Sequence, residues 1–107
     1  METFGDLIRK LREENGLPLR KVAANLDIDP STLSKIERNA RSANKDIIEK
    51  FAELFSIDKK ELLIAFLSDK IAYELINEDC SKDVLKAAEG KIKYIRNKNS
   101  KQGVFNF

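Results

Sequence analysis

The chain has 107 residues, of which 42% are hydrophobic and 36% charged, and its formal net charge is +2. This length allows one domain, or one domain with an appendage, and the mixed charges exclude a chain that is disordered throughout. Two prolines and four glycines among many Leu, Ile, Lys, Glu and Ala residues favour an all-α fold.

The first predicted helix covers residues 3–14. Thr3 with Asp6 three residues later is a weak capping box, and Asn15-Gly16 is a typical helix stop. The apolar residues recur at the spacing of one helical face. They are Phe4, Leu7, Ile8 and Leu11.

Two short helices are predicted next, over residues 18–26 and 30–38. Pro18 suits the first turn of a helix, where its missing N–H costs nothing, and Asp29 followed by Pro30 is a strong helix start. Asn39 tolerates the left-handed backbone that ends a helix. The apolar positions of this pair are Val22, Ala23, Leu26, Leu33 and Ile36.

Three further helices complete the prediction. The fourth helix is capped by Ser42 or Asn44. The fifth helix starts near Asp58 and has apolar positions through Ile76, and the sequence leaves open whether it continues unbroken past Ser68. The sixth covers about residues 82–96. We therefore expect a domain over 1–67, a helical extension over 68–97 and a flexible tail over 98–107.

The spacing of the second and third predicted helices is that of a helix-turn-helix, which presents its second helix to the DNA major groove. Ala23 is small where the two helices cross, and Ile28 is apolar where a residue must plug the turn. Positive charge gathers here, since residues 9–41 hold eight basic and five acidic residues. The side chains predicted to face outward are Ser31, Thr32, Ser34 and Lys35.

The segment LPLRKVAANLDIDPSTLSKIERNARSAN resembles the helix-turn-helix of the phage repressor and Cro-like family, also called the xenobiotic response element family. LIRKLREENG is similar to the first helix of that family, and the likeness extends through ELLIAFL. The resemblance implies a five-helix lambda-repressor-like DNA-binding domain with a C-terminal helical extension. It also implies a transcriptional regulator that binds a double-stranded DNA operator as a homodimer.

Carried over residue by residue, the resemblance implies roles for individual side chains. Lys35 can donate to guanine O6 and N7, and the Thr32 methyl group can meet a thymine methyl group. The family often has Gln where Leu19 stands, so the backbone contact expected there moves to neighbouring cations. The implied base readers are Ser31, Thr32, Ser34 and Lys35. The implied phosphate contacts are Arg20, Lys21, Arg38, Asn39, Arg41 and Ser42.

The resemblance also implies a structural ion pair. Arg12 and Glu37 match a family pair that links the first helix to the third, so Glu37 is expected to be structural. A carboxylate facing DNA phosphates would weaken binding. Asp27 and Asn39 replace positions often held by glycine, and both residue types tolerate a left-handed backbone.

The helices beyond Leu67 carry more apolar surface than a small domain leaves in water. They either pack back on the domain or pair with a second subunit. We favour a homodimer, because an operator arranged as an inverted repeat needs two reading helices about one DNA turn, ~34 Å, apart. The basic residues of 91–101 are either a solvated face or an added phosphate contact. The predicted dimer interface is Ile71, Leu75, Leu85, Ile92 and Ile95.

Other functions have little support in the sequence. The chain has no His and a single cysteine, Cys80, so we expect no disulfide, metal, cofactor or catalytic site. The N-terminus lacks a signal peptide, and the longest apolar run is too short for a membrane, which predicts a cytoplasmic protein. In its small size the chain is similar to the controller proteins of restriction-modification systems. The alternatives are an antitoxin that regulates its own operon and a protein–protein adaptor that uses the fold without DNA.

Overall fold

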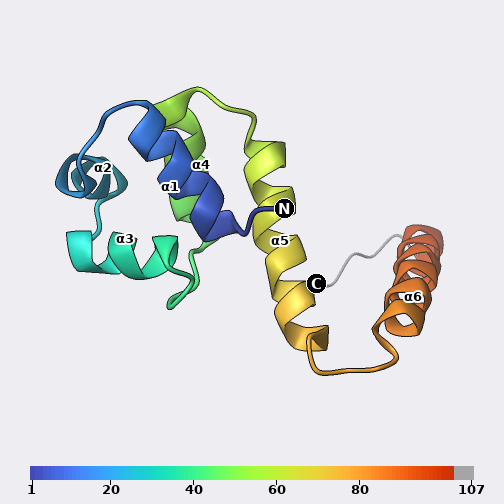
Figure 1. The fold of residues 1–107 in the computed structure, drawn as a ribbon. Helices are drawn as coiled ribbons and strands as arrows, with labels where there is room; N and C mark the ends of the chain where they lie inside the picture. The colour runs from blue at the N-terminus through green and yellow to red at the C-terminus, as the bar shows by residue number, and fades with distance from the viewer. Residues whose placement is uncertain (103–107) are drawn as a thin grey trace. The chain divides into compact units, whose positions relative to one another are not determined.

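The structure, a computed structural model, describes residues 1–102, and for residues 100–102 it describes the backbone only. These residues contain six α-helices (Figure 1). Within these residues there is no strand, so the all-α prediction is confirmed. None of the helices described is both long and apolar enough to cross a membrane. The helices are α1 (Phe4–Glu14), α2 (Leu19–Leu26), α3 (Pro30–Glu37), α4 (Lys45–Phe55), α5 (Lys59–Leu75) and α6 (Ser81–Gln102).

The chain divides into two compact units, Met1–Tyr73 and the residues from Glu74 on. In the first unit, α2 and α3 lie on one side, α5 on the other, and α1 and α4 between them (Figure 1). Its core is continuous across all five helices, with Phe51 of α4 fully buried and Phe4 of α1 edge-on to Phe66 of α5 at 5.7 Å between ring centroids. Every apolar position predicted for α2 and α3 is buried, so the core holds this pair of helices in place.

Helices α1 to α4 all end in the same hydrogen-bonded turn. In each, one residue with a left-handed backbone donates to the carbonyl three residues back, and the next residue donates to the carbonyl five residues back. Only one of the four left-handed residues is a glycine. They are Gly16 (φ 65°), Asp27 (φ 57°), Asn39 (φ 61°) and Ser56 (φ 53°). The residue that follows is apolar in each case, and Leu17, Ile28 and Ile57 pack against the core.

The turn after α4 leads to a prediction about stability. Ser56 is exposed and has a left-handed backbone, which strains any residue that carries a Cβ. We expect Ser56→Gly to raise the free energy of unfolding by about 0.5–1 kcal/mol in a denaturant titration. The matched control is Ser68→Gly in the middle of α5, which should lower it by about 0.5 kcal/mol. Equal losses in both variants would contradict the argument from backbone strain.

Several element boundaries differ from those expected. Pro18 and Arg38 are the capping residues of α2 and α3 and not helical residues. α5 runs unbroken through Ser68, so the boundary between the two units follows Tyr73 and comes later than the predicted Leu67. α6 continues to Gln102 because no Gly or Pro follows Gly90 until Gly103, so residues 98–102 are helical and not the predicted flexible tail. The rest of that predicted tail, 103–107, lies outside the described residues.

Candidate nucleic-acid interface

A tight turn sets the geometry of α2 and α3. The left-handed residue Asp27 ends α2, and the N–H of Ile28 donates to the carbonyl of Ala23 at 3.0 Å. Ala23 is fully buried, as the close crossing of two helices requires, while Ile28 packs against the core. Leu33 and Ile36 then fix α3 by its inner face. The opposite face of α3 is therefore left at the surface on a rigid support.

The outward face of α3 carries the residues predicted to read bases. Ser31 and Lys35 are exposed and lie one turn apart, whereas Thr32 and Ser34 are half-buried. Among the described residues, no carboxylate lies within ion-pair distance of Lys35. This helix face therefore presents hydroxyl groups beside an ammonium group without an internal partner, which suits hydrogen bonding to base edges.

Exposed cations flank α3 at its carboxyl end. Arg41 Nη1 donates to Thr32 Oγ1 at 3.5 Å, and Arg38 Nε donates to the Ser34 carbonyl at 3.3 Å. The hydroxyl of Ser42 donates to the neighbouring Ala43 carbonyl at 3.1 Å. Two of the predicted phosphate contacts, Arg38 and Arg41, thus lie within hydrogen-bond distance of Ser34 and Thr32, two of the predicted base readers.

The start of α2 contributes the other predicted cations. Arg20 and Lys21 are exposed there, and no side chain caps the helix, because its N-cap is Pro18. Leu19 is half-buried and packs against the core. An apolar side chain in that position cannot form a hydrogen bond to a phosphate. Any phosphate contact at the start of α2 therefore has to come from the polar side chains or the backbone of its first turn.

Asn39, another predicted phosphate contact, uses its side chain inside the fold. Its Nδ2 donates to Thr3 Oγ1 at 2.9 Å, and its Oδ1 accepts from the Gly5 N–H at 3.3 Å. Both ends of the amide are therefore engaged with the start of α1. The structure assigns this side chain to the connection between α1 and α3, and the sequence carries no signal for that.

Arg12 and Glu37 form a bidentate ion pair beneath the surface. Arg12 Nε donates to Glu37 Oε2 at 2.8 Å, and Arg12 Nη2 donates to Oε1 at 3.0 Å. The Glu37 residue is only 5% exposed. The hydrogen bond that Arg12 donates to the Glu37 carboxylate raises the pKa of Arg12 above its ordinary value, partly opposed by burial. This pair turns the one carboxylate of α3 inward, away from the face that carries Ser31 and Lys35.

Two further residues hold α1 against its neighbours, Gly5 against α3 and Asp69 against α5, and sequence reasoning missed both. Gly5 lies so close to the end of α3 that a Cβ there would be 2.6 Å from the Ile36 and Glu37 carbonyl oxygens. Asp69 Oδ2 of α5 accepts from the Phe4 N–H at 2.7 Å. A glycine in the first turn of a helix was a signal for close packing, whereas nothing in the sequence joins Asp69 to Phe4.

The residues predicted for a dimer interface are mostly at the surface of this single chain. Ile71 is 49% exposed, as is Ile92, while Leu85 and Ile95 are 48% and 42% exposed. Leu75 is half-buried. These side chains lie on α5 and α6, and large exposed apolar patches are a common feature of interaction sites.

Comparisons with known proteins agree with this geometry. The helix-turn-helix family model matches residues 8–62, just over half of the chain. The structure is similar to a solved structure titled SinR protein/SinI protein complex, with a TM-score of 0.52 and 22% sequence identity over 89% of this chain and 99% of that chain. At this identity the likeness concerns the fold alone. No curated protein sequence matches the chain.

Proposed function

Since the chain belongs to the Cro/C1-type helix-turn-helix family of DNA-binding transcription regulators, we propose that it recognises a specific operator through α3 in the major groove. We further propose that it binds as a homodimer to an inverted repeat. The observation that carries the proposal is the outward face of α3, where Ser31 and Lys35 are exposed while the only carboxylate of that helix is buried against Arg12. A surface of this composition fits the polyanionic groove of a duplex.

The proposed contacts divide by their chemistry. Side chains on the face of α3 would meet base edges and determine sequence preference, whereas the cations around it would meet phosphates and set affinity and register. The proposed base readers are Ser31, Thr32, Ser34 and Lys35. The proposed phosphate contacts are Arg20, Lys21, Arg38, Arg41 and Ser42, with Asn39 contributing through its backbone.

The first test is selection of binding sites from a random duplex library, followed by affinity measurements over a range of salt concentrations. We expect two half-sites about one helical turn apart and, with ~6 phosphate contacts, a log–log slope of affinity on salt of about −5. An adaptor that uses the same fold without DNA would enrich no sequence and bind no duplex even at low salt. That result would refute the proposed function.

Replacing the exposed cation of α3 is expected to change sequence preference. Lys35→Ala should weaken binding to the selected operator by about 1–3 kcal/mol and relax the preference at one base pair of each half-site. The reason is the loss of a donor that pairs with guanine O6 and N7. The measurement is fluorescence anisotropy on the operator and on its single-base variants.

Arg41→Ala is the matched control for this measurement, because it removes an exposed cation that would contact phosphate and not a base. It should weaken binding to operator and random DNA alike and reduce the magnitude of the salt slope by about one. If Lys35→Ala instead weakens both DNAs equally, Lys35 is a phosphate contact and the assigned base reading is wrong.

The proposed homodimer is supported by the apolar positions of α6. Leu85, Ala88, Ile92 and Ile95 follow a spacing of three, four and three residues, which is the repeat of a paired helix. We expect Ile92→Lys to shift the chain toward the monomer in sedimentation equilibrium and to weaken operator binding, because one half-site alone remains. Lys93→Ala, on the neighbouring exposed position, is the control. A wild-type chain that is monomeric both free and on DNA would contradict the dimer.

A further inference from the structure

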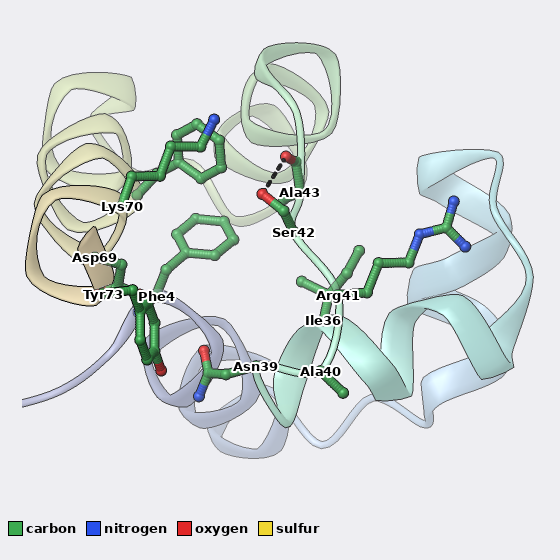
Figure 2. A pocket seen from close by; sticks show the side chains of 11 residues that line it. Phe4, Ile36, Asn39, Ala40, Arg41, Ser42, Ala43, Asp69, Lys70 and Tyr73 are labelled. Carbon is green, nitrogen blue, oxygen red and sulfur yellow. Dashed lines mark hydrogen bonds between the residues drawn. The ribbon is translucent and has the colours of Figure 1, made fainter. Parts of the chain in front are cut away.

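A cavity lies in the first unit where the start of α1, the end of α3, the α3–α4 loop and α5 meet (Figure 2). Its volume is about 190 Å³. A dry protein cavity of about 150 Å³ holds one benzene molecule, so this one has room for a single ring with a small substituent. None of the proposed base readers of α3 lines this space.

Most of the cavity wall is apolar. The rings of Phe4 and Phe66 meet edge-on at 5.7 Å between centroids, and Ile36 contributes an aliphatic surface from α3. Tyr73 is 55% exposed and lines the same cavity from α5. Aromatic and aliphatic walls of this kind suit the flat or branched apolar body of a small ligand.

Three charged residues line the cavity, and Lys70 supplies a positive charge without an ion-pair partner among the described residues. Its Nζ lies over the Phe66 ring, 4.5 Å from the centroid, and no carboxylate of the described residues is within ion-pair distance of it. Arg41 turns its guanidinium away from the other side chains of the cavity (Figure 2), and its Nη1 donates to Thr32 Oγ1. Asp69, the one lining carboxylate, already accepts from the Phe4 N–H at the start of α1. A ligand in the cavity therefore meets one ammonium group without an internal ionic partner.

From this arrangement we propose that the cavity is a binding site for a small carboxylic acid with a compact apolar body, such as an aromatic carboxylate. The apolar body lies against the side chains of Phe4, Phe66 and Ile36 that line the cavity. The carboxylate accepts hydrogen bonds from the Lys70 ammonium and from the hydroxyl of Ser42, which also lines the cavity and now donates only to the adjacent Ala43 carbonyl. A charged donor at the mouth and an apolar interior together select this class of ligand.

The site is coupled to DNA binding, and this part of the inference rests on the proposed function. The α3–α4 loop forms one wall of the cavity and carries Arg41 and Ser42, two of the proposed phosphate contacts. An anion held at Ser42 repels a DNA phosphate at the same place, so the ligand and the operator oppose each other. Because coupling between two sites is reciprocal, each weakens the binding of the other by the same factor.

The binding itself is tested without DNA, using benzoate as the probe and amide chemical shifts of the full chain as the readout. We expect benzoate to shift the amides of Ser42, Ala43 and Lys70 with a dissociation constant of about 1 mM. Benzamide, which has the same shape without the charge, should bind about fivefold more weakly. Equal binding of the two probes, or no shift at these amides, overturns the proposal.

Variants assign the binding to this cavity. Lys70→Gln should weaken benzoate binding about fivefold, and Lys60→Gln, an exposed lysine of the same helix outside the cavity, should leave it unchanged. Tyr73→Ala removes the ring that lines the cavity from α5 and should weaken benzoate binding. Thermal unfolding shows whether each variant is folded. Unchanged benzoate affinity in folded Lys70→Gln and Tyr73→Ala would exclude this site.

The coupling is tested by measuring operator affinity in sodium benzoate against sodium acetate at the same ionic strength. Acetate has the carboxylate without the ring, so the comparison removes the general salt effect. We expect benzoate, but not acetate, to weaken operator binding of the wild-type chain severalfold and to have no such effect on Lys70→Gln. Benzoate binding with unchanged operator affinity refutes the coupling alone, whereas failure to bind any operator refutes the proposed function and leaves the ligand site standing.

Discussion

Gly5→Ala is expected to lower the free energy of unfolding of the first unit by about 3 kcal/mol, because the added methyl group has no room. Its Cβ would lie 2.6 Å from two backbone carbonyl oxygens of α3 and from Asn39 Oδ1. Backbone atoms cannot rotate away as a side chain can, so α1 and the end of α3 must separate. The change should be visible as a lower midpoint in denaturant titration, and operator affinity should fall because Arg38 and Arg41 move with the end of α3.

Gly90→Ala provides the matched control for this prediction. Gly90 lies inside α6, and no atom is within 4 Å of the place where its Cβ would be. The same substitution there should stabilise the helix by up to about 1 kcal/mol, since alanine is the better helix former. If Gly5→Ala were as stable as the wild-type chain and bound operator equally well, the close approach of α1 to α3 described here would be wrong.

Removing Glu37 is expected to have the second large effect. Arg12 and Glu37 have side chains that are 12% and 4% exposed, so Glu37→Ala removes the buried, bidentate partner of a guanidinium nearly out of water and leaves it only the exposed Glu13 at 4.0 Å. Breaking a buried pair in this way costs about 3–5 kcal/mol. We expect that loss in the free energy of unfolding, together with weaker operator binding because the end of α3 is no longer tied to α1.

The double variant Arg12→Met/Glu37→Leu distinguishes two causes of the stability lost in Glu37→Ala: a buried charge without its partner, and the loss of the contact itself. With both charges gone and similar volumes in place, stability should return to near that of the wild-type chain. Losses that simply add would show that the two residues do not act as a pair. Because the Glu37 carboxylate raises the pKa of Arg12, the stabilisation from this arginine is present from neutral pH up to its unfolded-state pKa. It is lost only when the pH rises through the folded-state value, far above neutral.

Much of the first unit could be predicted because the information is local. The spacing of Val22, Ala23, Leu33 and Ile36 and the helix start at Pro30 depend on neighbours within a few residues. Local signals were also incomplete. Asp29 is the N-cap of α3, as expected, yet its side chain makes no capping hydrogen bond.

What could not be predicted depends on contacts between residues far apart in the sequence. The hydrogen bond from Phe4 to Asp69 spans most of the first unit, and the amide of Asn39 is shared between Thr3 and Gly5. The cavity beside them exists only because α1, α3 and α5 converge. No residue pattern within a single helix encodes such a meeting point, so Lys70 was indistinguishable from other surface lysines.

The hydrogen bond between Phe4 and Asp69 also decides how short an autonomously folding fragment of this chain can be. The region that matches the family model, residues 8–62, contains neither partner of that bond. A fragment that stops at Leu67 would keep α2 and α3 but would leave the first N–H of α1 without its acceptor. A fragment that stops at Tyr73 keeps it. We therefore expect the shortest fragment that folds on its own to include both partners of this hydrogen bond, and so to extend past residues 8–62 at both ends.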